Sequence, residues 1–245
     1  MGKVIKTFAR SGLFFLSKLE SVFDKAYLID EVPLSRNIEP SELAEYVTAK
    51  DGGKLRILEI GSREVTGPSK FREQFPNAEY VGFDYYAARN VDVVGDVHLL
   101  SSYFEVGEKF DIIYTIACFE HFAMPWVVAL EMSKMLKVGG VVYIKTHFSF
   151  SAHERPWNFF QFSDMGLRVL FSSAMGFECI EAGMSNPIVG RFSRFAEKRL
   201  RNSPVRGLYC GSEYLGRKVR EEKDFNWNTV SASEVVSGTT YPSPQ

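Results

Sequence analysis

The chain has 245 residues, of which 45% are hydrophobic and 24% charged, a composition typical of a globular protein with one substantial core. Its 29 Lys and Arg residues nearly balance 30 Asp and Glu residues, and the formal net charge of -1 argues against a nucleic-acid partner. No apolar run reaches the roughly 18 residues that a membrane span needs. We therefore expect a cytoplasmic protein.

Three cysteines, Cys118, Cys179 and Cys210, stand far apart in the sequence. An odd number at wide spacing fits neither a disulfide framework nor a CxxC metal site, so we expect free thiols in a reducing compartment. The histidines and carboxylates show no metal-ligand spacing either, and the sequence predicts no metal site.

Residues 1–53 are predicted to form an N-terminal helical cap. The first part, MGKVIKTFARSGLFFLSKLESVF, alternates basic and apolar residues as an amphipathic helix does. Packing over the following domain or a partner subunit is the favoured interpretation, and contact with an anionic membrane surface is the alternative. A second helix is expected at residues 40–47, with Ser41 as its N-cap and the KDGGK turn after it.

From residue 54 onward, short β-rich runs alternate with helical patterns, which indicates βαβ units in a parallel sheet. The predicted strands are 55–60, 80–83, 91–94, 111–116, 141–146 and 178–182, with a final strand pair within 207–219. The predicted helices are 69–74, 125–136 and 164–173, the last capped by Ser163 and ended by Gly176. This domain is expected to cover 54–222, with acceptor insertions at about 147–162 and 184–206 and a flexible tail at 223–245.

The clearest local feature is ILEIGSREVTG at residues 57–67, an apolar strand with an acidic residue, followed by a glycine turn. Gly61 lets the backbone approach a nucleoside, and the turn is expected to point backbone N–H groups at the ligand. The next strand ends in VGFDYY, which places Asp84 where its carboxylate can accept both ribose hydroxyls. Because GSREVTG lacks the GxGxxG spacing of a pyrophosphate loop, a ligand with a ribose and an ammonium group fits better than a nicotinamide dinucleotide.

Four blocks follow one another in the order ILEIGSREVTG, YVGFDYY, VDVVGDVHLL and FDIIYTIACFEHF, and MLKVGGVVYI follows Pro125 and Trp126. Over residues 55–182 the chain resembles class I S-adenosylmethionine-dependent methyltransferases of the broad methyltransferase-11 type. The resemblance implies an α/β fold, a Rossmann-like, doubly wound, mostly parallel seven-stranded sheet with helices on both faces. It also implies S-adenosyl-L-methionine as cofactor and S-adenosyl-L-homocysteine as product.

The resemblance assigns roles to individual residues. Glu59 and Gly61 would face the methionine part, Asp84 the ribose, and Asp96 the adenine amino group. The predicted cofactor-binding residues are Glu59, Gly61, Ser62, Asp84, Tyr85, Asp96, Val97, Thr115 and Ile116, and ordinary core packing is the alternative for the apolar ones. Two positions depart from the family pattern: Arg63 replaces the usual second glycine, and Ala117 stands where many relatives have an acidic residue.

Methyl transfer from a sulfonium is an in-line displacement, so the protein positions the acceptor and, for a hydroxyl, removes a proton. Imidazole, with an ordinary pKa of about 6.5, can do this near neutral pH. His121 follows the fourth predicted strand, and His147 and His153 lie in THFSFSAHERPWNFFQFSD, a stretch that reads as a functional lid. The predicted catalytic residues are His121, His153 and His147. The alternatives are a strand cap for His147 and a surface pair with Glu154 for His153.

The aromatic residues of the lid, Trp157, Phe159, Phe160 and Phe162, either fill core space or stack against a flat acceptor. The segment HERPWNFFQFSDMGLRVLF resembles the corresponding region of methyltransferases found with glycan and cell-surface polysaccharide enzymes. Residues 185–206 are basic, which suits an anionic acceptor, although a solvated surface helix is the favoured interpretation.

The leading hypothesis is O-methylation of a small molecule, with a sugar or glycan hydroxyl as acceptor and a histidine as base. The alternative is a catalytically silent, nucleoside-binding partner subunit, which Arg63 and Ala117 motivate. The sequence leaves a homo-oligomer open.

Overall fold

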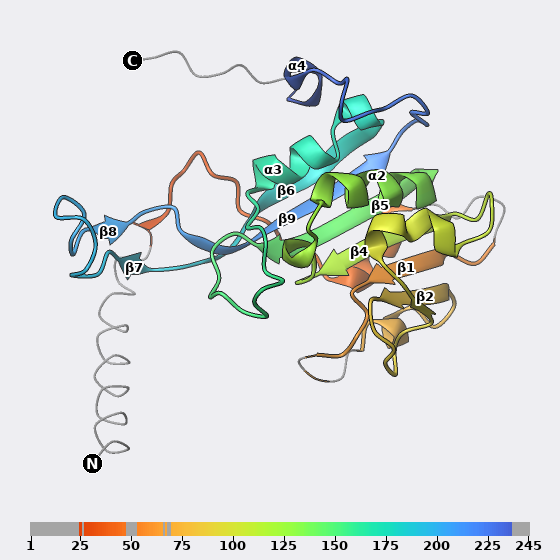
Figure 1. Ribbon diagram of the computed structural model, residues 1–245, viewed down its shortest axis with the longest axis horizontal. Helices are drawn as coiled ribbons and strands as arrows, with labels where there is room; N and C mark the ends of the chain where they lie inside the picture. Colours follow the sequence, from red (N-terminus) through yellow and green to blue (C-terminus); the bar gives the residue numbers. More distant parts are fainter. Residues whose placement is uncertain (1–24, 26, 48–52, 66, 68–69, 237–245) are drawn as a thin grey trace.

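The computed structural model describes residues 25, 27–47, 53–65, 67 and 70–236, and its centre is a seven-stranded sheet (Figure 1). The strands lie in the order β3-β2-β1-β4-β5-β9-β6, and β9 is antiparallel to both of its neighbours while the other pairs are parallel. Their bounds are β1 Arg56–Ile60, β2 Glu79–Asp84, β3 Val93–Val94, β4 Phe110–Ile116, β5 Leu136–His147, β6 Phe177–Pro187 and β9 Tyr209–Lys218. The predicted Rossmann-like, mostly parallel sheet is confirmed.

The segment predicted to hold a final strand pair forms a single strand, β9. Its two glycines lie in the strand ladder rather than in a turn, since Gly211 pairs with His147 and Ser185, and Gly216 pairs with Val142 and Cys179. Because β9 supplies hydrogen-bond partners on both sides, β5 and β6 are longer than predicted. A separate hairpin, β7 (Gly190–Arg191) with β8 (Pro204–Val205), extends from one end of the sheet (Figure 1).

Helices cover both faces of the sheet, as predicted. One face packs against α2 (Pro125–Met135), α3 (Asp164–Leu170) and the 3-10 helix η5 (Val97–Tyr103), with Val128, Met132 and Leu167 buried between them. The other face packs against the 3-10 helices η2 (Pro40–Tyr46) and η4 (Arg72–Gln74), with Leu43 and Phe75 buried there. The central strands are apolar on both sides because both sides are covered.

The helix boundaries agree with the sequence at some points and differ at others. Ser163 caps α3 by accepting a hydrogen bond from Gly166 N at 3.0 Å, and Gly176 adopts φ 88°. The predicted helix 164–173 is, however, divided into α3 and the 3-10 helix η7 (Ser173–Met175). Glu39, not Ser41, caps η2, because its side chain and that of Glu42 form a reciprocal capping box.

Of the two ends of the described chain, one pairs with the sheet and the other packs on helices. Leu34 makes a parallel bridge to Met184 of β6, so this part of the predicted helical cap is extended. The predicted amphipathic helix of the first 23 residues lies outside the described residues. Where a flexible tail is predicted, Trp227 donates to the carbonyl of Trp126 at 2.8 Å, and α4 (Ala232–Val235) follows. Among the described residues, no helix is long and apolar enough to cross a bilayer.

Candidate functional site

The predicted site residues lie at the carboxyl edge of the parallel strands. The strand order reverses between β1 and β4, and in doubly wound sheets a ligand binds at this switch point. The ends of these strands carry Gly61 after β1, Asp84 at the end of β2, Ala117 after β4 and His147 at the end of β5.

Gly61 stands where the chain leaves β1. Its φ is 83°, and a Cβ at this position would lie 2.7 Å from Cys118 Sγ. The N–H groups of Gly61 and Ser62 both donate to the carbonyl of Phe83, at 2.9 and 3.2 Å. The turn therefore joins β1 to the end of β2. The prediction that these two N–H groups face a ligand is wrong, because both are bonded to Phe83.

We expect Gly61→Ala to lower the free energy of unfolding by about 3 kcal/mol, because the added methyl meets both a positive φ and a close sulfur atom. Gly107→Ala is the matched control, since Gly107 has φ 89° but no atom within 4 Å of an added Cβ. The control should lose only about 1 kcal/mol. Urea unfolding of both variants measures the difference, and equal losses would show that the contact with Cys118 is unimportant.

Asp84 is held by the residue that departs from the family pattern. Its Oδ2 accepts from Arg63 N at 3.2 Å, and its Oδ1 lies 3.6 Å from Arg63 Nε. The Arg63 guanidinium also lies 5.3 Å from the centre of the Tyr86 ring. The carboxylate that the sequence predicts for ribose is thus in place at the strand end, with an arginine beside it.

Glu59 lies in the interior, 6% exposed. Its Oε2 accepts from the Tyr80 hydroxyl at 2.5 Å, and Tyr80 also contacts the Tyr114 hydroxyl. Burial raises the pKa of Glu59 above its ordinary value, although the Tyr80 hydrogen bond and the charge of Arg72 oppose the change. The predicted contact with the methionine part remains a prediction.

We expect Glu59→Gln to stabilise the fold at pH 7 by about 1 kcal/mol, because it removes a buried charge and keeps an acceptor for Tyr80. The pKa of Glu59 is raised in the folded state. Ionisation of Glu59 therefore lowers the stability of the fold as the pH rises from the pKa of the unfolded chain to the higher pKa of the folded protein. The advantage of the variant should therefore shrink as the pH falls toward about 4.3. Thermal unfolding at pH 4 to 8 checks this, with the exposed Glu73→Gln as control; an advantage independent of pH would contradict it.

Asp96 is paired with a histidine that the sequence reasoning did not single out. Its Oδ1 accepts from His98 N at 2.9 Å and lies 2.6 Å from His98 Nδ1, while His98 Nε2 accepts from Met124 N at 3.2 Å. The ring proton is therefore on Nδ1. Burial acts to raise the pKa of Asp96, but the hydrogen bonds from His98 outweigh it and lower the pKa. The carboxylate is half-exposed and ionised, as an acceptor for an adenine amino group should be.

The other predicted cofactor residues differ in exposure. Ser62, Val97 and Thr115 are buried, and the hydroxyl oxygens of Ser62 and Thr115 have no hydrogen-bond partner. Ile116 is half-buried at the end of β4, and Tyr85 is exposed. After Ile116 the chain turns sharply at Ala117, which has φ 49°, an unusual conformation for alanine.

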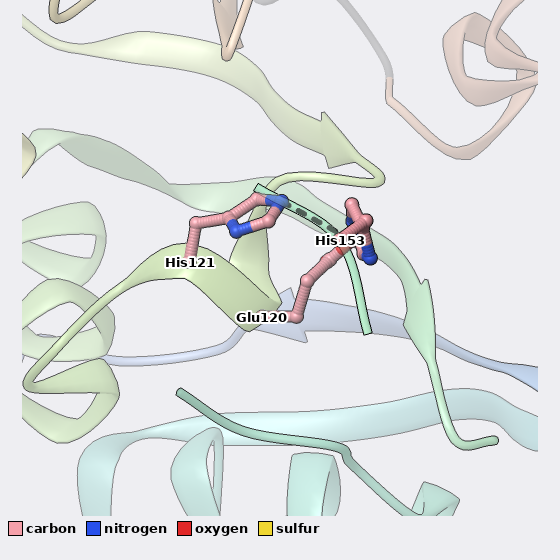
Figure 2. A group of neighbouring side chains, drawn as sticks. All are labelled: Glu120, His121 and His153. Atoms are coloured by element: carbon pink, nitrogen blue, oxygen red, sulfur yellow. Dashed lines mark ion pairs between the residues drawn. The ribbon is translucent and has the colours of Figure 1, made fainter. Parts of the chain in front are cut away.

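The three predicted catalytic histidines surround one carboxylate, that of Glu120 (Figure 2 shows two of them with it). Glu120 lies in the 3-10 helix η6 (Phe119–His121) after β4 and is fully buried. Its Oε1 is 3.8 Å from His121 Nε2, 3.9 Å from His153 Nε2 and 2.6 Å from His147 Nδ1. Its Oε2 accepts from the Thr146 hydroxyl at 2.7 Å.

Glu120 is ionised in spite of its burial. Burial alone would raise its pKa, but the interactions with His147 and Thr146 outweigh that effect and lower the pKa. The sequence analysis assigns Glu120 no role. Its signal was its place directly after β4, at the edge where ligands bind.

The lid runs from the end of β5 back over η6. Phe159 N and Phe160 N both donate to the carbonyl of Glu120, at 3.0 and 3.2 Å, and Phe162 N donates to the carbonyl of His147 at 2.8 Å. Phe162 is buried and Phe160 packs against the core, whereas Trp157 and Phe159 are exposed. The core interpretation is thus confirmed for Phe160 and Phe162, and stacking against an acceptor remains a prediction for Trp157 and Phe159.

Comparison with known protein families assigns this chain to one of them. A sequence model described as a methyltransferase domain matches residues 29–177, which is more than half of the chain. No curated protein matches the chain.

The similar solved structures have low sequence identity to this chain, and several of them are described as methyltransferases. The plantazolicin methyltransferase BamL, in complex with a triazolic desmethylPZN analog and SAH, has a TM-score of 0.50 and 15% identity, covering 74% of this chain and 83% of its own. TehB from Haemophilus influenzae has a TM-score of 0.46 and 14% identity, covering 75% of this chain and 63% of its own. For the CurJ carbon methyltransferase the values are 0.45 and 12%, with 69% and 50% covered. This chain thus spans half of CurJ and less than two thirds of TehB, and the likeness to BamL concerns the fold.

Proposed function

Since the chain belongs to the methyltransferase-domain family and has the fold of class I S-adenosylmethionine-dependent methyltransferases, we propose that it methylates a hydroxyl of a small molecule, with a sugar or glycan as acceptor. S-adenosyl-L-methionine is the cofactor, and S-adenosyl-L-homocysteine is the product. The observation that carries the proposal is the group of histidines around Glu120, because it puts bases at the edge of the sheet where the cofactor binds.

His121 is our candidate for the base. Its Nδ1 contacts the carbonyl of Trp157, which requires the proton on Nδ1 and leaves the lone pair on Nε2. Nε2 lies 3.8 Å from Glu120 Oε1 and 3.9 Å from Glu154 Oε2. In the reaction the acceptor oxygen forms a bond to the methyl carbon, the sulfur–carbon bond breaks, and the hydroxyl proton moves to Nε2. Both carboxylates then stabilise the imidazolium.

The exposed aromatics of the lid support a sugar acceptor. Trp157 and Phe159 lie edge to face, with ring centres 5.6 Å apart, and Trp157 lies 6.4 Å from Tyr85, which follows β2. These rings are next to His121, because Trp157 supplies the carbonyl that His121 contacts. Rings beside a base suit an acceptor with an apolar face and hydroxyl groups at its rim.

A catalytically silent subunit is the second candidate, and the Arg63–Asp84 pair favours it, because Arg63 engages the carboxylate that the ribose would use. Mass spectrometry distinguishes the two. The purified protein is incubated with S-adenosylmethionine and a panel of sugars, nucleotide sugars and phenols. Formation of S-adenosylhomocysteine, together with a product roughly 14 Da heavier than the acceptor because one CH₂ is added, supports the enzymatic function. Cofactor binding without any turnover supports the silent subunit.

We expect Arg63→Ala to bind S-adenosylmethionine up to about fivefold more tightly, because the ribose no longer displaces a partly exposed ion pair. Arg63→Lys keeps the positive charge and should bind nearly as the wild type does. Calorimetric titration measures both. Weaker binding by Arg63→Ala would show instead that the arginine contacts the cofactor.

A further inference from the structure

We propose that Glu120, His121 and His153 form a binding site for a divalent transition-metal ion of the zinc type. Each residue offers one ligand atom, and these three atoms lie within 4.8 Å of one another (Figure 2). The ligands come from η6 and from the lid, 32 positions apart in the sequence (121 to 153), which is why spacing along the chain gave no sign of them. The inference does not rest on the proposed reaction.

The ligand atoms lie somewhat farther apart than a bound ion would set them. Glu120 Oε1 is 3.8 Å from His121 Nε2 and 3.9 Å from His153 Nε2, and the two Nε2 atoms lie within 4.8 Å of each other. A tetrahedral ion with ligands at roughly 2.1 Å sets neighbouring ligand atoms about 3.4 Å apart. Binding would therefore shorten the two Oε1–Nε2 distances by about half an ångström and the Nε2–Nε2 separation by at most about 1.4 Å.

Both imidazoles are oriented as metal ligands are. His121 Nδ1 contacts the carbonyl of Trp157, and His153 Nδ1 lies 2.9 Å from the carbonyl of Ser151. A carbonyl accepts only, so each Nδ1 carries the proton and each Nε2 presents its lone pair toward Glu120. A backbone carbonyl on the far nitrogen is the usual support of a metal-bound histidine.

The carboxylate supplies an independent observation. Glu120 is fully buried, and its Oε1 has no hydrogen-bond partner, although Oε2 accepts from Thr146. His147 Nδ1 is an ion-pair partner 2.6 Å from Oε1, but the contact does not have the geometry of a hydrogen bond for either atom. A buried anionic oxygen whose nearest donor is poorly aligned is costly, and a cation between Oε1 and the two Nε2 atoms would satisfy it.

The ligand set selects the kind of ion. Two imidazoles and one carboxylate suit zinc and its neighbours in the first transition row, whereas magnesium and calcium prefer oxygen ligands alone. Three protein ligands leave a fourth position open, as in catalytic zinc sites. Glu154, half-exposed and 3.9 Å from His121 Nε2, stands beside that position.

A bound ion and a proton would use the same lone pairs. With an ion in place, His121 could not act as base, and the acceptor oxygen would instead bind the ion at the open position. Coordination lowers the pKa of a hydroxyl, so its proton would pass to water before the oxygen attacks the methyl carbon.

The test measures metal binding directly, without the methyl-transfer assay. Full-length protein is freed of metal with a chelator and titrated with zinc in a calorimeter, and metal content is measured after equilibrium dialysis. We expect one zinc per chain, no comparable binding of magnesium, and visible absorption of the cobalt(II) form. His121→Asn and His153→Asn should each weaken zinc binding by at least about tenfold, and the double variant should abolish it.

His98→Asn is the matched control, because His98 is paired with Asp96 away from Glu120, and its zinc binding should equal that of the wild type. The melting temperature shows that each variant is folded. Absence of stoichiometric zinc binding in the wild type would overturn the proposal, as would unchanged binding in the double variant. Zinc binding without methyl transfer would support the site and count against the proposed function alone.

Discussion

Asp84→Ala is expected to weaken binding of S-adenosylmethionine and S-adenosylhomocysteine by at least about 100-fold, because two charge-assisted hydrogen bonds to the ribose are lost. Asp84 is held at the end of β2 by the backbone N–H groups of Arg63 and Tyr86, so its position is set before the ligand arrives. Calorimetric titration measures the dissociation constants of both ligands.

The matched control is Glu178→Ala, which removes an exposed carboxylate from β6, the outermost strand on the side of the sheet away from β2. Its binding should equal that of the wild type. If Asp84→Ala bound the cofactor as tightly as this control, the ribose would not use Asp84, and the assignment of the cofactor to this edge would need another carboxylate.

His121→Gly should lower kcat by about 10² to 10³, because removal of a positioned base costs this much. The affinity for S-adenosylmethionine should stay within about twofold, since a base for the acceptor adds little to cofactor binding. Stopped-time assays of S-adenosylhomocysteine formation give kcat, and calorimetry gives the affinity.

Added imidazole provides the control for His121→Gly. If the lost group acts through its ring nitrogen, free imidazole should restore part of the rate in this variant and leave the wild type unchanged. A variant that loses cofactor affinity in proportion to kcat would show instead that His121 supports the structure of the site.

The sequence predicted the parallel strands well and the helices less well. Strands such as β1 and β4 are covered on both faces, so their sequences are mostly apolar. The predicted cap of η2 was wrong because Ser is the better N-cap in isolation, whereas the reciprocal bonds between Glu39 and Glu42 place the cap at Glu39.

For the site, the sequence predicted which segments meet but not which of their side chains are buried or paired with one another. Asp84 and the three histidines follow from strand ends, because parallel strands bring those ends to one edge. The burial of Glu120 and the pairing of Asp96 with His98 depend on contacts between segments, and no local pattern encodes them. The Arg63–Asp84 contact likewise needs the turn after β1 folded against the end of β2.

Strand β9 lies between β5 and β6 in the sheet but follows both in the sequence, so the sheet can form completely only after β9 has been synthesised. A nascent chain that ends before residue 209 has β5 and β6 but not the strand that pairs with both, so each exposes a row of unpaired backbone groups. The segment that matches the methyltransferase family, residues 29–177, stops short of β9. A fragment cut to that match would be prone to aggregate, and during synthesis the sheet closes only after β9 has left the ribosome.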